Sequence, residues 1–205
     1  LFGVEALLRS SEPSMPGPQH VLDAATQLGH LALLGRRVRA LSARALSPSN
    51  QPMTLFVNLH PEDLGDIDRI ARDAPLTELA PRVILEITER ASLTSSPELV
   101  ARLARLRTLG FRIAVDDIGA GYSGLTSFTE LMPEIVKIDM SLVRNVHQSA
   151  VKQQTIRALC NLCHEVGCLV VGEGVETKDE NDCIVDLGCD LVQGYLLGRP
   201  SRELP

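Results

Sequence analysis

Short apolar segments of strand type alternate with helical patterns through most of the chain. The segments are rich in Val, Ile and Leu and contain few polar residues, which is typical of strands buried on both faces. Strands that alternate with helices in this way predict parallel βα units. The predicted strands are 3–8, 53–57, 82–85, 111–115, 134–136, 168–172 and 190–192.

Helical periodicity fills most of the gaps between these strands. After a loop rich in Ser and Pro, the region 19–46 is predicted to form two helices that separate near Gly29 or Gly35. Three further helical patterns are each followed by glycine, at the position where a left-handed residue commonly ends a helix. These patterns are 97–109, 150–166 and 178–187, followed by Gly110, Gly167 and Gly188.

We therefore predict an α/β fold of the TIM-like (β/α)8 barrel class. Such a barrel has eight strands and usually about 250 residues, whereas this sequence of 205 residues shows seven strand segments. The chain opens on Leu1-Phe2-Gly3-Val4-Glu5, a mid-strand pattern, so we expect the first strand upstream of Leu1. Residues 1–205 would then be one domain, truncated at its N-terminus. A doubly wound open sheet is the alternative, but no GxGxxG or phosphate loop follows any strand.

Residues of metal-ligand type stand at or beside the ends of these strands. The active site of a barrel of this class forms at the C-terminal ends of the strands, so these side chains are expected to meet at one rim. Strand ends are often polar, and an Asp pair alone can be a solvated turn, but that explanation predicts a mixture of Ser, Thr, Lys and Gly. The residues are Glu5, Asn58, Glu86, Asp116, Asp117 and Glu173, while Lys137 and Gln193 end two other strands.

Carboxylates gathered at one rim require cations. Two like charges about 4 Å apart repel by roughly 4 kcal/mol at an effective dielectric near 20. Oxygen ligands favour hard ions such as Mg²⁺ or Mn²⁺, and a pair of ions about 3.5–4 Å apart is the recurrent device for attack on phosphate esters. Lys137 can orient the attacking water, and Arg9 can hold a phosphate by a bidentate contact. The pattern predicts a metal-dependent phosphodiesterase or phosphatase.

Composition indicates which kinds of binding partner and which cellular compartment are expected. The formal charge of −6 argues against a DNA-binding surface, and no apolar run approaches the roughly 20 residues of a membrane span. Without a signal peptide, the odd count of 5 cysteines favours reduced thiols in the cytoplasm. Cys160-Asn161-Leu162-Cys163-His164 matches a haem-attachment pattern, and zinc bound with Cys168 is a second alternative. Buried, inert thiols agree better with the helical spacing.

A set of short motifs, spread over nearly the whole chain, resembles the EAL domain family of bacterial cyclic di-GMP phosphodiesterases. Each motif contains one or more of the strand-end residues, and the motifs follow one another in the order of that family. They are Glu5-Ala6-Leu7, Val57-Asn58-Leu59, Leu85-Glu86-Ile87-Thr88-Glu89, Asp116 to Ser123, Val136-Lys137-Ile138-Asp139, Glu173-Gly174-Val175-Glu176 and Gln193 to Pro200.

The resemblance implies hydrolysis of one phosphodiester bond of cyclic di-GMP to the linear product pGpG, with two divalent cations, Mg²⁺ or Mn²⁺. By residue match, one ion is held by Glu5, Asn58, Glu86 and Asp116. The second is held by Asp116, Asp117 and Glu173, with Asp116 bridging. Lys137 contacts the nucleophilic water, and Glu89 steadies the loop Gly119–Ser123. Residues that position substrate or water are Arg9, Asp139, Glu176 and Gln193.

Several of these assignments have a structural alternative. Asp139 can cap the helix expected near Met140, Glu176 can pair near Lys178, and Arg9 and Glu89 can be solvated surface charges. The chain also departs from the family, because a first strand that carries a substrate-contacting glutamine is absent, and the loop from Arg9 is short and lacks an aromatic residue. The family's contacts to guanine on that side are therefore not carried over to this chain.

The resemblance also implies partners. We expect cyclic di-GMP as substrate, a homodimer formed through the region around Gly119–Ser123, and regulatory domains elsewhere in the full-length chain. No membrane insertion by this domain is expected, and the bacterial cytoplasm is the expected compartment, although other domains of the full-length protein can anchor it. A catalytically weak cyclic di-GMP receptor is the alternative function, and a barrel enzyme for another phosphate ester is a third.

Overall fold

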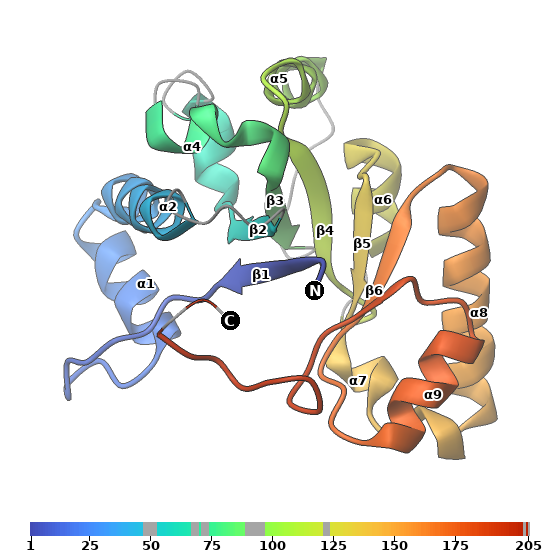
Figure 1. Ribbon diagram of the computed structural model, residues 1–205. Helices are drawn as coiled ribbons and strands as arrows, with labels where there is room; N and C mark the ends of the chain where they lie inside the picture. The colour runs from blue at the N-terminus through green and yellow to red at the C-terminus, as the bar shows by residue number, and fades with distance from the viewer. Residues whose placement is uncertain are drawn as a thin grey trace. The chain divides into compact units, whose positions relative to one another are not determined.

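The computed structural model describes residues 1–46, 53–66, 70, 74–88, 97–120, 124–202 and 204 (Figure 1). The chain divides into two compact units, and each is described by itself. The first unit comprises Leu1–Leu85, Ala101–Phe111 and Glu203–Pro205. The second comprises Glu86–Val100 and Arg112–Arg202. Strand β3 (Val83–Thr88) begins in the first unit and ends in the second.

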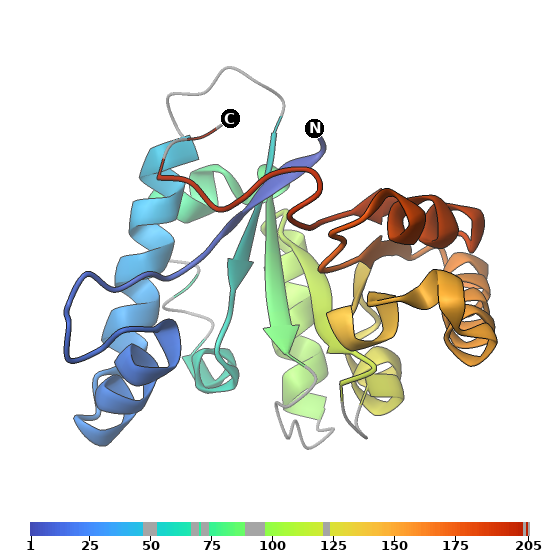
Figure 2. The ribbon, with the colours of Figure 1, turned by 90° about the horizontal axis from the view of Figure 1, so that it is seen from below.

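In the first unit, β1 (Gly3–Ala6) pairs in parallel with β2 (Thr54–Asn58), and the register sets Glu5 opposite Phe56. The segment between β1 and β2 forms α1 (Pro18–Gln27) and α2 (Leu31–Leu46), which contact each other, with α1 at one end of α2 in Figure 2. The remaining elements of this unit are η1 (Pro61–Asp66), α4 (Ala74–Glu78), η2 (Ala80–Arg82) and most of α5 (Pro97–Thr108).

The two helices α1 and α2 separate at Gly29, as predicted. Gly29 has a φ of +67°, a conformation that glycine adopts without steric cost. Gly35, the other predicted break, lies inside α2, where an added Cβ would approach the carboxylate of Asp63 to 2.9 Å. This carboxylate accepts a hydrogen bond of 2.8 Å from Nη1 of Arg39 in α2, and both side chains are buried. The ion pair therefore joins α2 to η1 at a point where only glycine leaves room.

In the second unit, three parallel pairings join four strands in sequence order: β4 (Arg112–Ile118), β5 (Ile135–Ile138), β6 (Leu169–Gly172) and β7 (Leu191–Val192). Ile113, Ala114, Val115 and Ile135 are fully buried, as expected for strands covered on both faces. The helices of this unit are α6 (Gly124–Leu131), α7 (Met140–Val143), η3 (Val146–Gln148), α8 (Ala150–Glu165) and α9 (Lys178–Asp186). Helix α8 packs against β6 and α9 (Figure 1).

The seven predicted strands are confirmed in the part of the chain that the structure describes. Strand β2 ends on Asn58, as predicted, whereas β3 and β4 continue past Glu86 and Asp117, the polar residues at which the prediction ended them. Hydrogen bonding between strands does not depend on side-chain polarity, so an apolar pattern underestimates strand length. The predicted helix ends at Gly110, Gly167 and Gly188 are also confirmed, with φ values of +100°, +79° and +107°.

The cysteines of the second unit are all free, and four of the five are buried. Sγ of Cys160 in α8 lies 3.9 Å from Sγ of Cys189 before β7. Each helix in the described part of the chain is too short or too polar to span a lipid bilayer.

Candidate functional site

The two adjacent aspartates of β4 stand at an irregularity in the strand. Val115 pairs with Val136 and Ile118 pairs with Ile138, so β4 holds one residue more than β5 over this interval. Such a bulge sets two residues opposite one. Asp117 has a φ of +61°, the left-handed conformation, which Asp tolerates better than most residues. In a regular strand, the side chains of neighbouring residues point to opposite faces. The bulge allows the side chains of Asp116 and Asp117 to reach the same site.

A third carboxylate completes a cluster with these two. Glu173 directly follows β6, and its backbone N–H donates to the carbonyl of Ile138 at 3.1 Å. Carboxylate oxygens of Asp116, Asp117 and Glu173 all lie within 4.8 Å of one another. The predicted ligand set for the second ion is therefore gathered in the second unit.

Lys137 lies among carboxylates and is only 1% exposed. Its Nζ is 2.5 Å from Oε1 of Glu86, 3.2 Å from Oδ1 of Asp116 and 2.8 Å from Oε1 of Glu173. A buried ammonium group is costly unless it is paired, and here three carboxylates supply that pairing. Because Lys137 opposes Val171 in the β5–β6 register, it shares a face of the sheet with Glu173, two residues further along.

Glu86 is the most buried member of this group. It belongs to β3, and its side chain is 0% exposed. An ionised carboxylate at such a position requires a cation close by, and the Nζ of Lys137 meets that requirement. Glu86, Asp116 and Glu173 thus share one cation inside the second unit.

The first unit holds the other two predicted ligands. Asn58, the last residue of β2, donates from Nδ2 to Oε1 of Glu5 in β1 at 3.2 Å. The parallel pairing of β1 and β2 brings these two side chains together. Arg9 lies beyond the end of β1 and is exposed, and its Nη1 donates to the carbonyl of Leu8 at 2.8 Å.

Two predicted substrate residues also have structural contacts. The carboxylate of Asp139 accepts a 2.9 Å hydrogen bond from the N–H of Ser141 and so caps α7. Gln193 follows β7, and its backbone joins two neighbours: its N–H donates to Gly172 at 2.9 Å, and its carbonyl accepts from Val175 at 3.1 Å. The capping alternative for Asp139 is therefore realised, and its role toward substrate stays a prediction.

Glu176 has a partner that was not predicted. Its Oε2 lies 2.7 Å from Nη1 of Arg144, and the two side chains are 45% and 30% exposed. Glu180, which is 1% exposed, also contacts this guanidinium. The spacing Thr177-Lys178-Asp179-Glu180 matches a capping box, so this pattern could have identified Glu180 from sequence. No local pattern points to Arg144.

Some predictions fall outside the described residues. Glu89 lies there, as do Gly121 to Ser123 of the loop expected to support a dimer. The described start of that loop contains Gly119, with a φ of +107° and the side chain of Leu142 directly beside it.

The residues present suit divalent cations. The cluster of Asp116, Asp117 and Glu173 presents only oxygen atoms, the ligand type that Mg²⁺, Mn²⁺ and Ca²⁺ prefer. The acidic groups outnumber the single ammonium group of Lys137 that the structure describes among them. Additional positive charge would therefore stabilise this arrangement.

Comparison with known proteins identifies close relatives. Cyclic di-GMP phosphodiesterase RocR of Pseudomonas aeruginosa is 35% identical over 166 residues, which cover 78% of this chain and 42% of RocR. Klebsiella pneumoniae BlrP1, solved with manganese and cyclic di-GMP, is 32% identical with a TM-score of 0.84, covering 97% of this chain and 51% of that chain. The PaMucR phosphodiesterase, solved with cyclic di-GMP, is 28% identical with a TM-score of 0.85, covering 98% and 85%.

This chain spans 42% of the length of RocR and 25% of the length of a signaling protein of Caulobacter vibrioides. The solved relatives are TIM-like barrels, so the predicted fold class is confirmed. The sequence model of the EAL domain matches residues 1–200. The chain therefore belongs to the EAL domain family.

Proposed function

We propose that this chain is a cyclic di-GMP phosphodiesterase that hydrolyses its substrate to linear pGpG. The observation that carries the proposal is the cluster of Asp116, Asp117 and Glu173 beside the buried ammonium group of Lys137. Members of the family without this cluster would lack the ligands for a second ion. Relatives named as cyclic di-GMP phosphodiesterases, and solved relatives in complex with that dinucleotide, support the choice of substrate.

Two divalent cations, Mg²⁺ or Mn²⁺, complete the proposed site. Glu5, Asn58, Glu86 and Asp116 would hold one ion, and Asp116, Asp117 and Glu173 the other. The manganese in solved BlrP1 supports this choice of metal. When bound, such ions polarise a phosphoryl oxygen and make a water molecule more acidic.

The chain's own residues hold the reactants. Lys137 exchanges one of its three carboxylate contacts for the attacking water, to which its ammonium group donates a hydrogen bond that orients it. Asp139, Glu176 and Gln193 position the dinucleotide, and Arg9 contacts a phosphate. Glu89 steadies the loop Gly119–Ser123. We further propose that residues 1–205 act as one domain of a longer cytoplasmic protein, with regulatory domains and a homodimer formed near that loop.

The test is to incubate the purified protein with cyclic di-GMP and Mg²⁺ and to separate the products by anion-exchange chromatography. We expect pGpG from the wild type and none from an Asp117→Asn variant. Tight binding of cyclic di-GMP without formation of product would show that the protein acts as a receptor and not as an enzyme. Absence of both binding and product would overturn the proposed function.

A further inference from the structure

The segment that follows β6 carries two of the proposed functional residues, Glu173 and Glu176. It is a loop of five residues, 173–177, between β6 and α9. A loop free to move would displace both carboxylates, and a misplacement of about 1 Å in a reacting group can cost on the order of a hundredfold in rate. The contacts that hold this loop therefore bear on the reaction.

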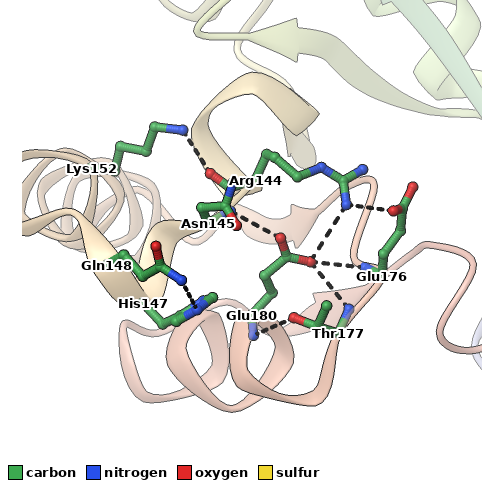
Figure 3. Close-up of polar contacts among 8 residues, drawn as sticks. All are labelled: Arg144, Asn145, His147, Gln148, Lys152, Glu176, Thr177 and Glu180. Atoms are coloured by element: carbon green, nitrogen blue, oxygen red, sulfur yellow. Dashed lines mark hydrogen bonds and ion pairs between the residues drawn. The ribbon is translucent and has the colours of Figure 1, made fainter.

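Glu180 is the centre of these contacts (Figure 3). Its Oε1 accepts a 2.9 Å hydrogen bond from the N–H of Asn145. Its Oε2 accepts from the N–H groups of Glu176 and Thr177, at 3.0 and 3.2 Å. One buried carboxylate thus joins the loop after β6 to the turn after α7. Burial raises the pKa of Glu180, but these N–H donors and the charge of Arg144 outweigh burial and lower it.

Arg144 acts on the side chain of Glu176 instead of on the backbone. Figure 3 shows its guanidinium between the carboxylates of Glu176 and Glu180, with Nη1 at 2.7 and 3.8 Å from their Oε2 atoms. The backbone carbonyl of Arg144 accepts a 2.7 Å hydrogen bond from Nζ of Lys152 in α8. The arginine is therefore anchored at its main chain and extends toward a carboxylate that solvent still reaches.

Two glycines let the rest of the loop pack closely. Gly174 has a φ of +68°, and an added Cβ would collide with Met140 at the start of α7. Val175 donates to Gln193 at 3.1 Å and accepts from the N–H of Leu196 at 3.0 Å, and Gly194 lies directly against its backbone. These contacts hold the backbone of the loop on the α7 side and on the β7 side, and the ion pair with Arg144 holds the side chain of Glu176.

We propose that Arg144 and Glu180 are positioning residues for the reaction: Glu180 fixes the backbone of Glu176 and Thr177, and Arg144 orients the Glu176 carboxylate toward the dinucleotide. This inference rests on the proposed function for its effect on catalysis. An exposed ion pair contributes little to stability, so the value of the Arg144–Glu176 pair lies in geometry. Neither Arg144 nor Glu180 is expected to contact the reacting atoms.

A double-mutant cycle in the full chain tests the role of Arg144. We expect Arg144→Met to lower kcat/KM on the order of tenfold, and Arg144→Lys to lower it less, because lysine keeps the charge but not the planar fork. The double variant Arg144→Met with Glu176→Gln should lose no more than Glu176→Gln alone, since Arg144 acts through Glu176. Additive losses would overturn this role. Lys178→Met, which removes an exposed lysine paired with Asp182, is the control and should retain wild-type kinetics.

Amide hydrogen exchange tests Glu180 without any turnover. Glu180→Ala should speed exchange at the amides of Asn145, Glu176 and Thr177, because these three donate to its carboxylate. The amide of Val170, which donates to Asp190, should be unaffected. Unchanged exchange at all three amides would overturn the positioning by Glu180. If the wild type produces no pGpG, the proposed function fails, and the exchange rates still decide whether Glu180 holds the loop.

Discussion

Nζ of Lys137 in β5 lies 2.8 Å from Oε1 of Glu173, the residue that follows the neighbouring strand β6. The same ammonium group also contacts Glu86 and Asp116, so one buried cation joins the ends of three strands. This arrangement makes Lys137 necessary for the stability of the carboxylate cluster as well as for the proposed reaction.

Replacement of Lys137 by Met should therefore damage stability and activity together. Loss of one partner of a buried ion pair commonly costs about 3–5 kcal/mol, and here it leaves three carboxylates without their shared cation. We expect the free energy of unfolding in chelator to fall by that order and the turnover to be lost. Urea denaturation and product analysis measure the two effects. An equally stable variant would contradict the role of Lys137 as the counter-ion, and Lys178→Met serves as an exposed control.

Two substitutions of Asp117 should separate the ligand from the backbone conformation. Both Asp117→Asn and Asp117→Ala remove the carboxylate and should abolish detectable turnover. Asn tolerates the left-handed φ of +61°, whereas Ala pays roughly 1 kcal/mol for it. In the presence of a chelator, we therefore expect the Asn variant to melt close to the wild type and the Ala variant to melt lower. Calorimetry decides this, and equal melting temperatures would argue against the left-handed geometry.

Removal of divalent metal should destabilise the second unit. A ligand that binds only the folded state at 100 times its Kd stabilises that state by about 2.7 kcal/mol, and the cluster of Asp116, Asp117 and Glu173 is the proposed binding site. A chelator should lower the melting temperature of the wild type, and Mg²⁺ or Mn²⁺ should restore it. The Asp117→Asn variant should respond less. An identical response of the two proteins would remove this cluster from the metal site.

Replacement of Glu180 by Gln should make stability less sensitive to acid. The pKa of Glu180 is lower in the folded protein than the ordinary value for glutamate. Such a group stabilises the fold above its unfolded pKa of about 4.3, and this contribution is lost as the pH falls through the folded pKa. The difference in unfolding free energy between wild type and Glu180→Gln should be largest at neutral pH. It should shrink as the pH falls below the unfolded pKa and through the folded pKa of Glu180. If this difference in unfolding free energy instead grew as the pH fell, the lowered pKa of Glu180 would be contradicted.

Substitution of Gly194 should disturb the loop after β6 through packing alone. An added Cβ would collide with the backbone nitrogen and oxygen of Val175, and backbone atoms cannot move aside as flexible side chains can. Gly194→Ala should therefore lower the melting temperature and the turnover. Gly198→Ala is the matched control, because nothing lies within 4 Å of its added Cβ. Similar stability of the two variants would refute the close approach.

Local sequence patterns predict the order of strands and helices and the chemical types of the residues at the strand ends. Apolar runs, helical periodicity and terminal glycines are local signals, and Gly29, Gly110 and Gly188 end their helices as those signals indicate. The same holds for Asp139, whose ability to cap α7 follows from its place before Met140. The role of a residue can be predicted from the sequence where it contacts residues only a few positions away.

Which of these side chains contact one another depends on how distant segments pack. The bulge that lets Asp116 and Asp117 serve one face depends on the register between β4 and β5. The burial of Lys137 among carboxylates depends on strands that are distant in sequence, and the pairing of Arg144 with Glu176 spans the whole of α8 and β6. Such contacts depend on the packing of segments that are far apart in the sequence, which no local pattern encodes. These contacts bring the separate acidic residues together in one site.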